Sequence, residues 1–283
     1  MNHKRSMFLL TALVLGFAFL YIPILSMIVY SFNESRLVTV WGGFSVKWYG
    51  VLLDNRQMID AAWLSLRIAT VTATGAVIIG TMAGLALARF GQFKTRTVFS
   101  GMVTAPLVMP EVITGLSLLL LFVALGPLHY VPIPEERGFT TITIAHMTLT
   151  ISYVTVIVQS RLSTMDDSLE EAAMDLGARP FKVFLLITLP IIAPAMISGW
   201  LLSFTLSLDD LVIASFTSGP STNTLPMMIF STVRRGITPQ INALATIMVA
   251  IVTVFVIAAG LIMSRQERKR QMDMRLAEAQ IVS

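Results

Sequence analysis

The chain has 283 residues, of which 55% are hydrophobic and only 13% are charged. Soluble domains carry about 25% charged residues, so this composition indicates an integral membrane protein. The absence of cysteine excludes disulfides and thiol catalysis, and three histidines (His3, His129 and His146) argue against a His-based metal site. The formal net charge of +4 comes from basic residues beside apolar runs, a pattern typical of membrane orientation rather than of nucleic-acid binding.

Six apolar runs are long enough to cross a bilayer, because roughly 20 helical residues span about 30 Å of hydrocarbon. They lie at 7–31, 62–88, 98–125, 140–160, 186–213 and 242–263. The first follows a short basic segment, as in a signal peptide, but its apolar stretch is too long and lacks a small-residue cleavage site. We interpret it as a retained span. The sequence therefore predicts an all-α integral membrane protein with six transmembrane helices.

The distribution of Lys and Arg predicts that both termini are cytoplasmic. With this orientation, 13 of the 20 basic residues fall in inner segments, six fall in outer segments, and Arg67 lies in the second span near its outer end. Residues 265–283 form a charged cytoplasmic tail. On the outer side, loop 33–60 is long and aromatic, and the apolar piece Leu225–Phe230 is too short to cross, which favours a re-entrant or surface-lying segment.

Glu111 is a carboxylate in the middle of the third run, and Pro106 and Pro110 are predicted to break the helix before it. A carboxylate at the centre of a span costs about 2.5–3.5 kcal/mol on insertion scales, so such a residue is a candidate for function. It could serve a passing cation, or it could bind backbone groups that the prolines free. In the fourth run, His146 stands alone among Thr and Ile, which predicts an interhelical hydrogen bond.

The segment from Asp167 to Pro190 follows the fourth run on the cytoplasmic side. The pairs Asp167/Glu170 and Ser168/Glu171 both fit a capping box at a helix start. Leu169, Ala172, Ala173 and Leu176 share one face of that helix, Gly177 predicts a left-handed stop, and Pro180 can open a second short helix.

The polar face of this helix is acidic, and small alanines lie on the other face. A surface-lying lipid helix favours Lys and Arg above large apolar groups, whereas small side chains let a helix enter a protein groove. The acidic residues are Asp166, Asp167, Glu170, Glu171 and Asp175. The pattern therefore favours docking into a partner protein.

The same segment resembles the EAA loop of ABC importer permeases, because Glu171-Ala172-Ala173, Gly177, Ile187, Leu189 and Pro190 match its anchor positions. The resemblance implies a type I ABC importer permease fold with a cytoplasmic coupling helix held in a cleft of an ATPase subunit. The coupling residues would be Glu170, Glu171, Ala172, Ala173, Asp175, Gly177, Leu189 and Pro190. No GxxxxGK[ST] pattern occurs in the chain, so ATP and Mg would be bound by partner ATPase subunits, with no cofactor in this chain.

Asp209 and Asp210 interrupt the fifth apolar run. Two adjacent carboxylates need water, a cation or protonation to persist inside a membrane. They could line a pore, or they could lie in the outer headgroup zone if the span ends near Ser207. A pathway with such acids favours a cationic passenger.

Over nearly the full chain, the sequence is similar to permease subunits of polyamine importers of the spermidine/putrescine type. The matching stretches are LYIPIL and SFN (20–33), WGGFSVKWY (41–49), GWLLSFTLSLDDLVIASF (199–216) and NALAT (242–246). The resemblance is greatest to the second permease of the pair and to the putrescine branch. It implies a substrate pathway that includes Glu111, Ser207, Asp209, Asp210 and Trp48, although relatives often have Asp at the position of Glu111.

The implied partners are a second homologous permease forming a heterodimer, two copies of an ABC ATPase, and a periplasmic polyamine-binding protein. The implied location is the bacterial inner membrane. We expect an N-terminal helix and outer loop at 1–58, a transmembrane domain at 59–264 with the EAA loop at about 166–190, and the tail. An ABC permease for another cationic solute and a proton-coupled secondary transporter are the alternatives. The absence of HExxH and GxSxG patterns argues against an enzyme.

Overall fold

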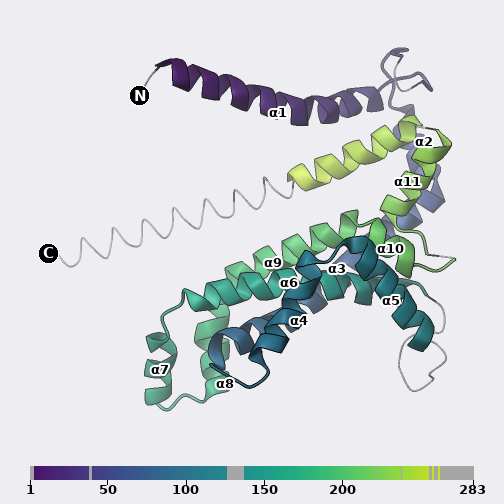
Figure 1. Cartoon of the computed structure of the whole chain (residues 1–283). Coiled ribbons are helices and arrows are strands. Elements are labelled where there is room, and N and C mark those ends of the chain that lie inside the picture. The colour runs from purple at the N-terminus through teal and green to yellow at the C-terminus, as the bar shows by residue number, and fades with distance from the viewer. Residues whose placement is uncertain are drawn as a thin grey trace. The chain divides into compact units, whose positions relative to one another are not determined.

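The computed structural model describes residues 3–37, 40–125, 137–220, 222–236 and 238–254, together with residues 257 and 261. Figure 1 shows the helices in this part of the chain. In order they are α1 (His3–Ser31), α2 (Lys47–Asp54), α3 (Arg56–Arg89), α4 (Arg96–Val108), α5 (Glu111–Leu125), α6 (Phe139–Ser163), α7 (Ser168–Asp175), α8 (Pro180–Val183), the π-helix η1 (Phe184–Thr188), α9 (Leu189–Asp209), α10 (Val212–Thr217) and α11 (Leu225–Arg235). A further apolar helix covers Pro239–Val254.

The chain divides into two compact units. Unit 1 comprises Met1–Arg56 and Thr232–Ser283, and unit 2 comprises Gln57–Ser231. The sequence-based division at 58/59 and 264/265 stays a prediction.

Four helical segments in the described residues are long and apolar enough to cross a membrane: Met7–Ser31, Arg56–Arg89, Phe139–Ser163 and Pro180–Asp209. The third predicted run is not one straight helix, since α4 and α5 meet at a bend of 115° and together would make a fifth span. The predicted helix break is confirmed at Pro110, but the predicted break at Pro106 is wrong, because Pro106 stays inside α4. The sixth predicted run lies partly outside the described residues, so the count of six stays a prediction.

The core of unit 2 is formed by α3, α6 and α9, which lie side by side in Figure 1. Small residues on α3 allow close packing, as is common between membrane helices. A Cβ atom added at Gly80 would lie 2.8 Å from the Cβ of Val154 on α6. Outside this core, the Trp200 indole on α9 donates to the exposed Thr74 hydroxyl on α3 at 3.2 Å, which links the two helices.

The short helices occupy opposite ends of unit 2 (Figure 1). The helices α7 and α8 lie near the start of α9, whereas α10 follows its end and packs on α5. The α5–α10 contact is close, because a Cβ atom at Gly115 would meet the Phe216 ring at 2.8 Å. The predicted site residues of unit 2 are therefore divided between its two ends and the α4–α5 break.

Candidate functional site

The N-terminal end of α7 is held by side chains other than the predicted capping box. Asp167 is the N-cap residue but makes no side-chain cap bond, so that prediction is wrong. Instead, the Ser168 amide donates to Oδ1 of Asp166 at 3.0 Å. This backbone bond, with a second bond from the Ser168 hydroxyl, lowers the pKa of the exposed Asp166 carboxyl.

The C-terminal end of α7 is a complete Schellman motif. The Gly177 amide donates to the Met174 carbonyl at 2.9 Å, and the Ala178 amide donates to the Ala173 carbonyl at 3.1 Å. Gly177 has a φ of +85°, which confirms the predicted left-handed stop. The prediction that Pro180 opens a second helix is also confirmed.

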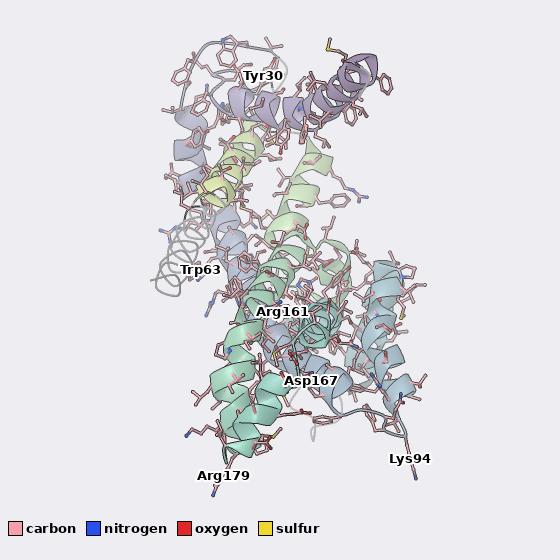
Figure 2. All side chains as sticks on the ribbon, turned by 90° about the vertical axis from the view of Figure 1, so that its left-hand side faces the viewer. Tyr30, Trp63, Lys94, Arg161, Asp167 and Arg179 are labelled. Atoms are coloured by element: carbon pink, nitrogen blue, oxygen red, sulfur yellow. The ribbon has the colours of Figure 1, made fainter. Side chains whose placement is uncertain are left out.

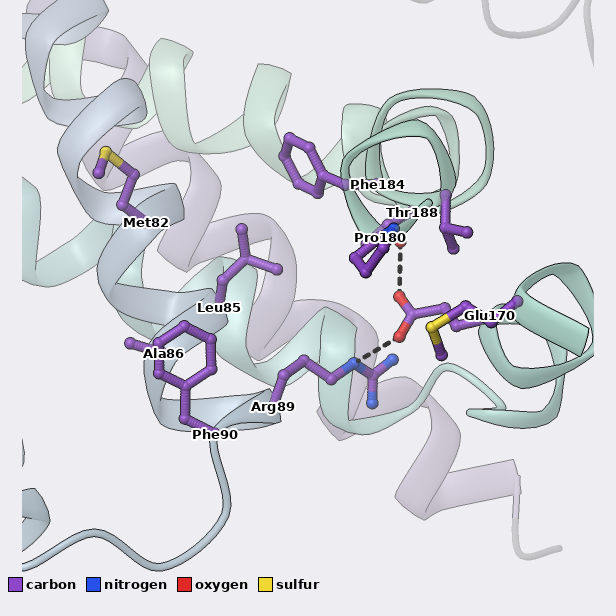
Figure 3. Close-up of a pocket in the computed structure, with 11 residues that line it drawn as sticks. Met82, Leu85, Ala86, Arg89, Phe90, Glu170, Pro180, Phe184 and Thr188 are labelled. Carbon is purple, nitrogen blue, oxygen red and sulfur yellow. Dashed lines mark hydrogen bonds and ion pairs between the residues drawn. The ribbon is translucent and has the colours of Figure 1, made fainter. Parts of the chain in front are cut away.

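Glu170 points inward from α7 to two different spans (Figure 3). Its Oε2 lies 3.2 Å from Nε of Arg89, the last residue of α3. Its Oε1 accepts a hydrogen bond of 2.5 Å from the Thr188 hydroxyl, at the junction of η1 and α9. Arg89 also pairs with the carboxylate of Asp167. The arrangement ties α7 to α3 and to the base of α9.

A cavity of about 580 Å³ lies between α7 and the spans. Apolar side chains form most of its wall, and the Arg89–Glu170 pair contributes the charged part (Figure 3). Its apolar lining residues are Met82, Leu85, Ala86, Phe90, Met174, Pro180, Val183 and Phe184. No residue of α7 is buried, so apolar packing within the chain contributes little to holding this helix.

The outer face of α7 carries the predicted docking residues. Glu171, Ala172 and Asp175 are exposed, Leu176 is 90% exposed, and Ala173 is half-buried. At the same end of unit 2, Figure 2 shows Lys94, Asp167 and Arg179. Leu189 and Pro190, the last anchors of the predicted motif, open α9. The predicted coupling residues are therefore together at one end of unit 2.

Asp210 lies at the opposite end of α9 and binds the chain itself. The predicted fifth run is broken here, because α9 ends at Asp209 and Asp210 has an extended backbone. The Asp210 carboxylate accepts the Ile213 amide at 3.2 Å and the Ala214 amide at 2.8 Å, so it caps α10. Its Oδ2 also lies 3.1 Å from Nε2 of His146.

His146 connects α6 to this break through both ring nitrogens. Its Nδ1 lies 2.7 Å from the Ser207 hydroxyl, and its side chain is 2% exposed. The predicted interhelical hydrogen bond of His146 is thus confirmed. Ser207 and Asp210 therefore both contact His146, and the Asp210 side chain is only 8% exposed.

Among the predicted pathway carboxylates, Asp209 and Glu111 remain open. Both are exposed in this chain, and neither forms an ion pair among the residues described by the structure. Glu111 is the first residue of α5, directly after the break. A helix N-terminus is a favourable place for an acidic side chain, because the helix dipole is positive at this end.

Trp48 belongs to unit 1, where its ring is 7% exposed. Its indole N–H donates to the Asn33 carbonyl at 2.7 Å, and Lys47 Nζ lies 5.1 Å from the ring centroid. The Asn33 side chain in turn binds the Val40 carbonyl and the Gly42 amide. The indole N–H of Trp48 is therefore already bonded within its own loop. Trp41, in the same loop, is by contrast 49% exposed.

Sequence reasoning missed Arg89 and Thr188, and it missed the link between His146 and Asp210. Arg89 had a usable signal, since a cation ending a span suits the helix dipole and faces an acidic cytoplasmic helix.

Among the described residues, no group of three or more His, Cys, Asp or Glu side chains could hold a metal ion.

Comparisons with known proteins agree on one family. A family model described as "Binding-protein-dependent transport system inner membrane component" matches residues 76–272. The chain is 56% identical over 273 residues to the "Putrescine transport system permease protein PotI" of Escherichia coli (strain K12), covering 96% of each chain. It is 43% identical over 246 residues to the "Spermidine/putrescine transport system permease protein PotC" of the same strain, covering 87% of this chain and 90% of the relative.

Solved structures share the fold at low identity. A chain of a bacterial ABC transporter involved in the import of alginate superposes with a TM-score of 0.72 at 16% identity, covering 93% of this chain and 96% of the other. A chain of the MetNI methionine ABC transporter gives a TM-score of 0.56 at 18% identity, covering 72% and 92%. The predicted all-helical ABC importer permease fold is confirmed.

Proposed function

The chain belongs to the family of inner-membrane components of binding-protein-dependent transport systems, and from this premise we propose that it forms half of the translocation pathway of a polyamine importer. As a member of this family it is a membrane transport subunit rather than an enzyme. Putrescine is the first proposed substrate and spermidine the second. The likeness to a putrescine permease over nearly the whole chain is the observation that carries the substrate assignment.

The open carboxylates support a cationic passenger. Asp209 at the end of α9 and Glu111 at the α4–α5 break are exposed and have no basic partner in the described part of the chain. We assign them to direct contact with ammonium groups, since opposite charges attract strongly where water is scarce. Ser207 and Asp210 would shape this end of α9, and Trp48 would hold the outer loop.

The exposed face of α7 supports docking to an ATPase. Its small and acidic residues suit a groove in a protein better than an anionic lipid surface. The complex would contain a second homologous permease, two ATPase subunits that bind ATP and Mg, and a periplasmic polyamine-binding protein. Both termini and α7 would be cytoplasmic, and closure of the ATPase dimer would act on the spans through α7.

Glu171 provides the test, because it is exposed on α7 while the neighbouring Glu170 is engaged internally. In proteoliposomes with the candidate partner subunits, Glu171→Lys should abolish both ATPase binding and ATP-dependent uptake of labelled putrescine. The control is Glu34→Lys, which makes the same change in the outer loop of unit 1. Uptake by wild type without any ATPase, or normal coupled uptake by Glu171→Lys, would refute the proposal.

A further inference from the structure

The attachment of α7 to the rest of unit 2 is polar. This helix has eight residues and none of them is buried. A cavity of about 580 Å³ lies between it and apolar side chains of α3. Packing across this cavity passes little displacement from α7 to α3, so the direct polar contacts carry that movement.

Arg89 is the centre of those contacts. It ends α3, a helix of 34 residues, and it meets carboxylates of both Asp167 and Glu170. The side chains of Arg89 and Glu170 are each 18% exposed, so water screens this pair less than a surface ion pair. Breaking it would leave the largely buried Glu170 carboxylate without its cationic partner, which makes separation unfavourable.

Glu170 extends the contact to a second span. Glu170 accepts a hydrogen bond from the hydroxyl of Thr188. Thr188 is 2% exposed and lies where the π-helix η1 passes into α9. Single-turn π segments are frequent at functional positions in helices. One carboxylate thus connects the end of α3 with the beginning of α9.

Glu170 and Glu171 have different surroundings although they are neighbours in sequence. Successive residues of a helix point about 100° apart, because one turn takes 3.6 residues. As a result, Glu171 is exposed, whereas Glu170 faces Arg89 (Figure 3). Partner docking and attachment to the spans are therefore carried by separate side chains.

We infer that Arg89 is a positioning residue for energy coupling, which clamps α7 to α3 and, through Glu170 and Thr188, to α9. Movement imposed on α7 by an ATPase then displaces both spans together. This inference rests on the proposed function, because it assumes that an ATPase drives transport. It assigns a role to a residue outside the EAA-like motif.

The complete transporter in proteoliposomes tests the clamp through the ratio of putrescine imported to ATP hydrolysed. Arg89→Met should bind the ATPase subunits as wild type does, yet lower this ratio about fivefold or more, the usual size of coupling between sites. Arg89→Lys keeps the cation and should recover part of the ratio. Thr188→Val keeps the shape without the hydroxyl and should give a smaller fall. Lys94→Met, an exposed residue in the following loop, is the charge-matched control and should leave the ratio unchanged.

The outcomes separate the clamp from the proposed function. If wild type shows no ATP-dependent putrescine uptake, the proposed function fails. If wild type is coupled and Arg89→Met keeps a ratio within about twofold of it, the clamp is refuted. If Arg89→Met does not assemble, Arg89→Lys and Thr188→Val decide, and wild-type ratios in both of them refute the clamp.

Discussion

Replacing either of the adjacent residues Asp209 and Asp210 by Asn should have different effects: loss of stability at Asp210 and loss of putrescine uptake at Asp209. Asp210 accepts two backbone amides and contacts His146, whereas Asp209 is exposed. Asn keeps one acceptor oxygen, so Asp210→Asn loses at least one charge-assisted bond, at about 1.5–3 kcal/mol. At about 2–4 °C per kcal/mol, the melting temperature should fall by roughly 3–12 °C.

Asp209→Asn should lower putrescine uptake while leaving stability within about 0.5 kcal/mol of wild type, as expected for an exposed side chain. Thermal unfolding of the purified protein in detergent, followed by tryptophan fluorescence, measures the first effect, and uptake in proteoliposomes measures the second. The reasoning is wrong if Asp210→Asn melts like wild type, or if both variants lose the same stability.

Three further substitutions test local features. Gly177→Val places a β-branched residue at a φ of +85°, which costs about 1–2 kcal/mol and should weaken ATPase co-purification. Asn tolerates this conformation, so Gly177→Asn should weaken co-purification less. Gly80→Ala forces a Cβ atom to within 2.8 Å of Val154 and should cost about 1–3 kcal/mol in thermal unfolding, while Gly101→Ala, with open space around it, should cost nothing. Trp48→Phe removes an indole bond of 2.7 Å and should cost about 0.5–1.5 kcal/mol, and an unchanged melting temperature would contradict this.

Features set by local sequence were predictable. Apolar run length located α1, α3 and α6 within a few residues, apart from the early start of α3 at Arg56. Gly177 and Pro180 marked the end of α7 and the start of α8 because glycine and proline restrict backbone geometry directly. The same local logic indicated a break near Pro110, although not that its two helices would meet at 115°.

Features set by distant residues were not predictable. The capping box failed because Glu170 is drawn to Arg89 and Thr188, which lie 81 and 18 positions away in sequence. The burial of Asp210 beside the exposed Asp209 depends in part on His146, which sequence alone could assign only to an unidentified interhelical bond. In both cases a partner from another helix contributes, and the residues next to the carboxylate in sequence do not identify that partner.

The shortness of α7 limits how its surface can be copied. Isolated helices below about 12–15 residues are marginal in water, and α7 has only eight. Its form therefore depends on the Schellman turn at Gly177 and on the flanking helices α6 and α8, which fix the two ends of the loop. A synthetic peptide spanning 166–178 would include the turn but not the flanking helices, and it would lose conformational entropy on binding an ATPase. Such a peptide should be a weak competitor, and grafting this loop onto another scaffold would require two fixed helix ends to hold it.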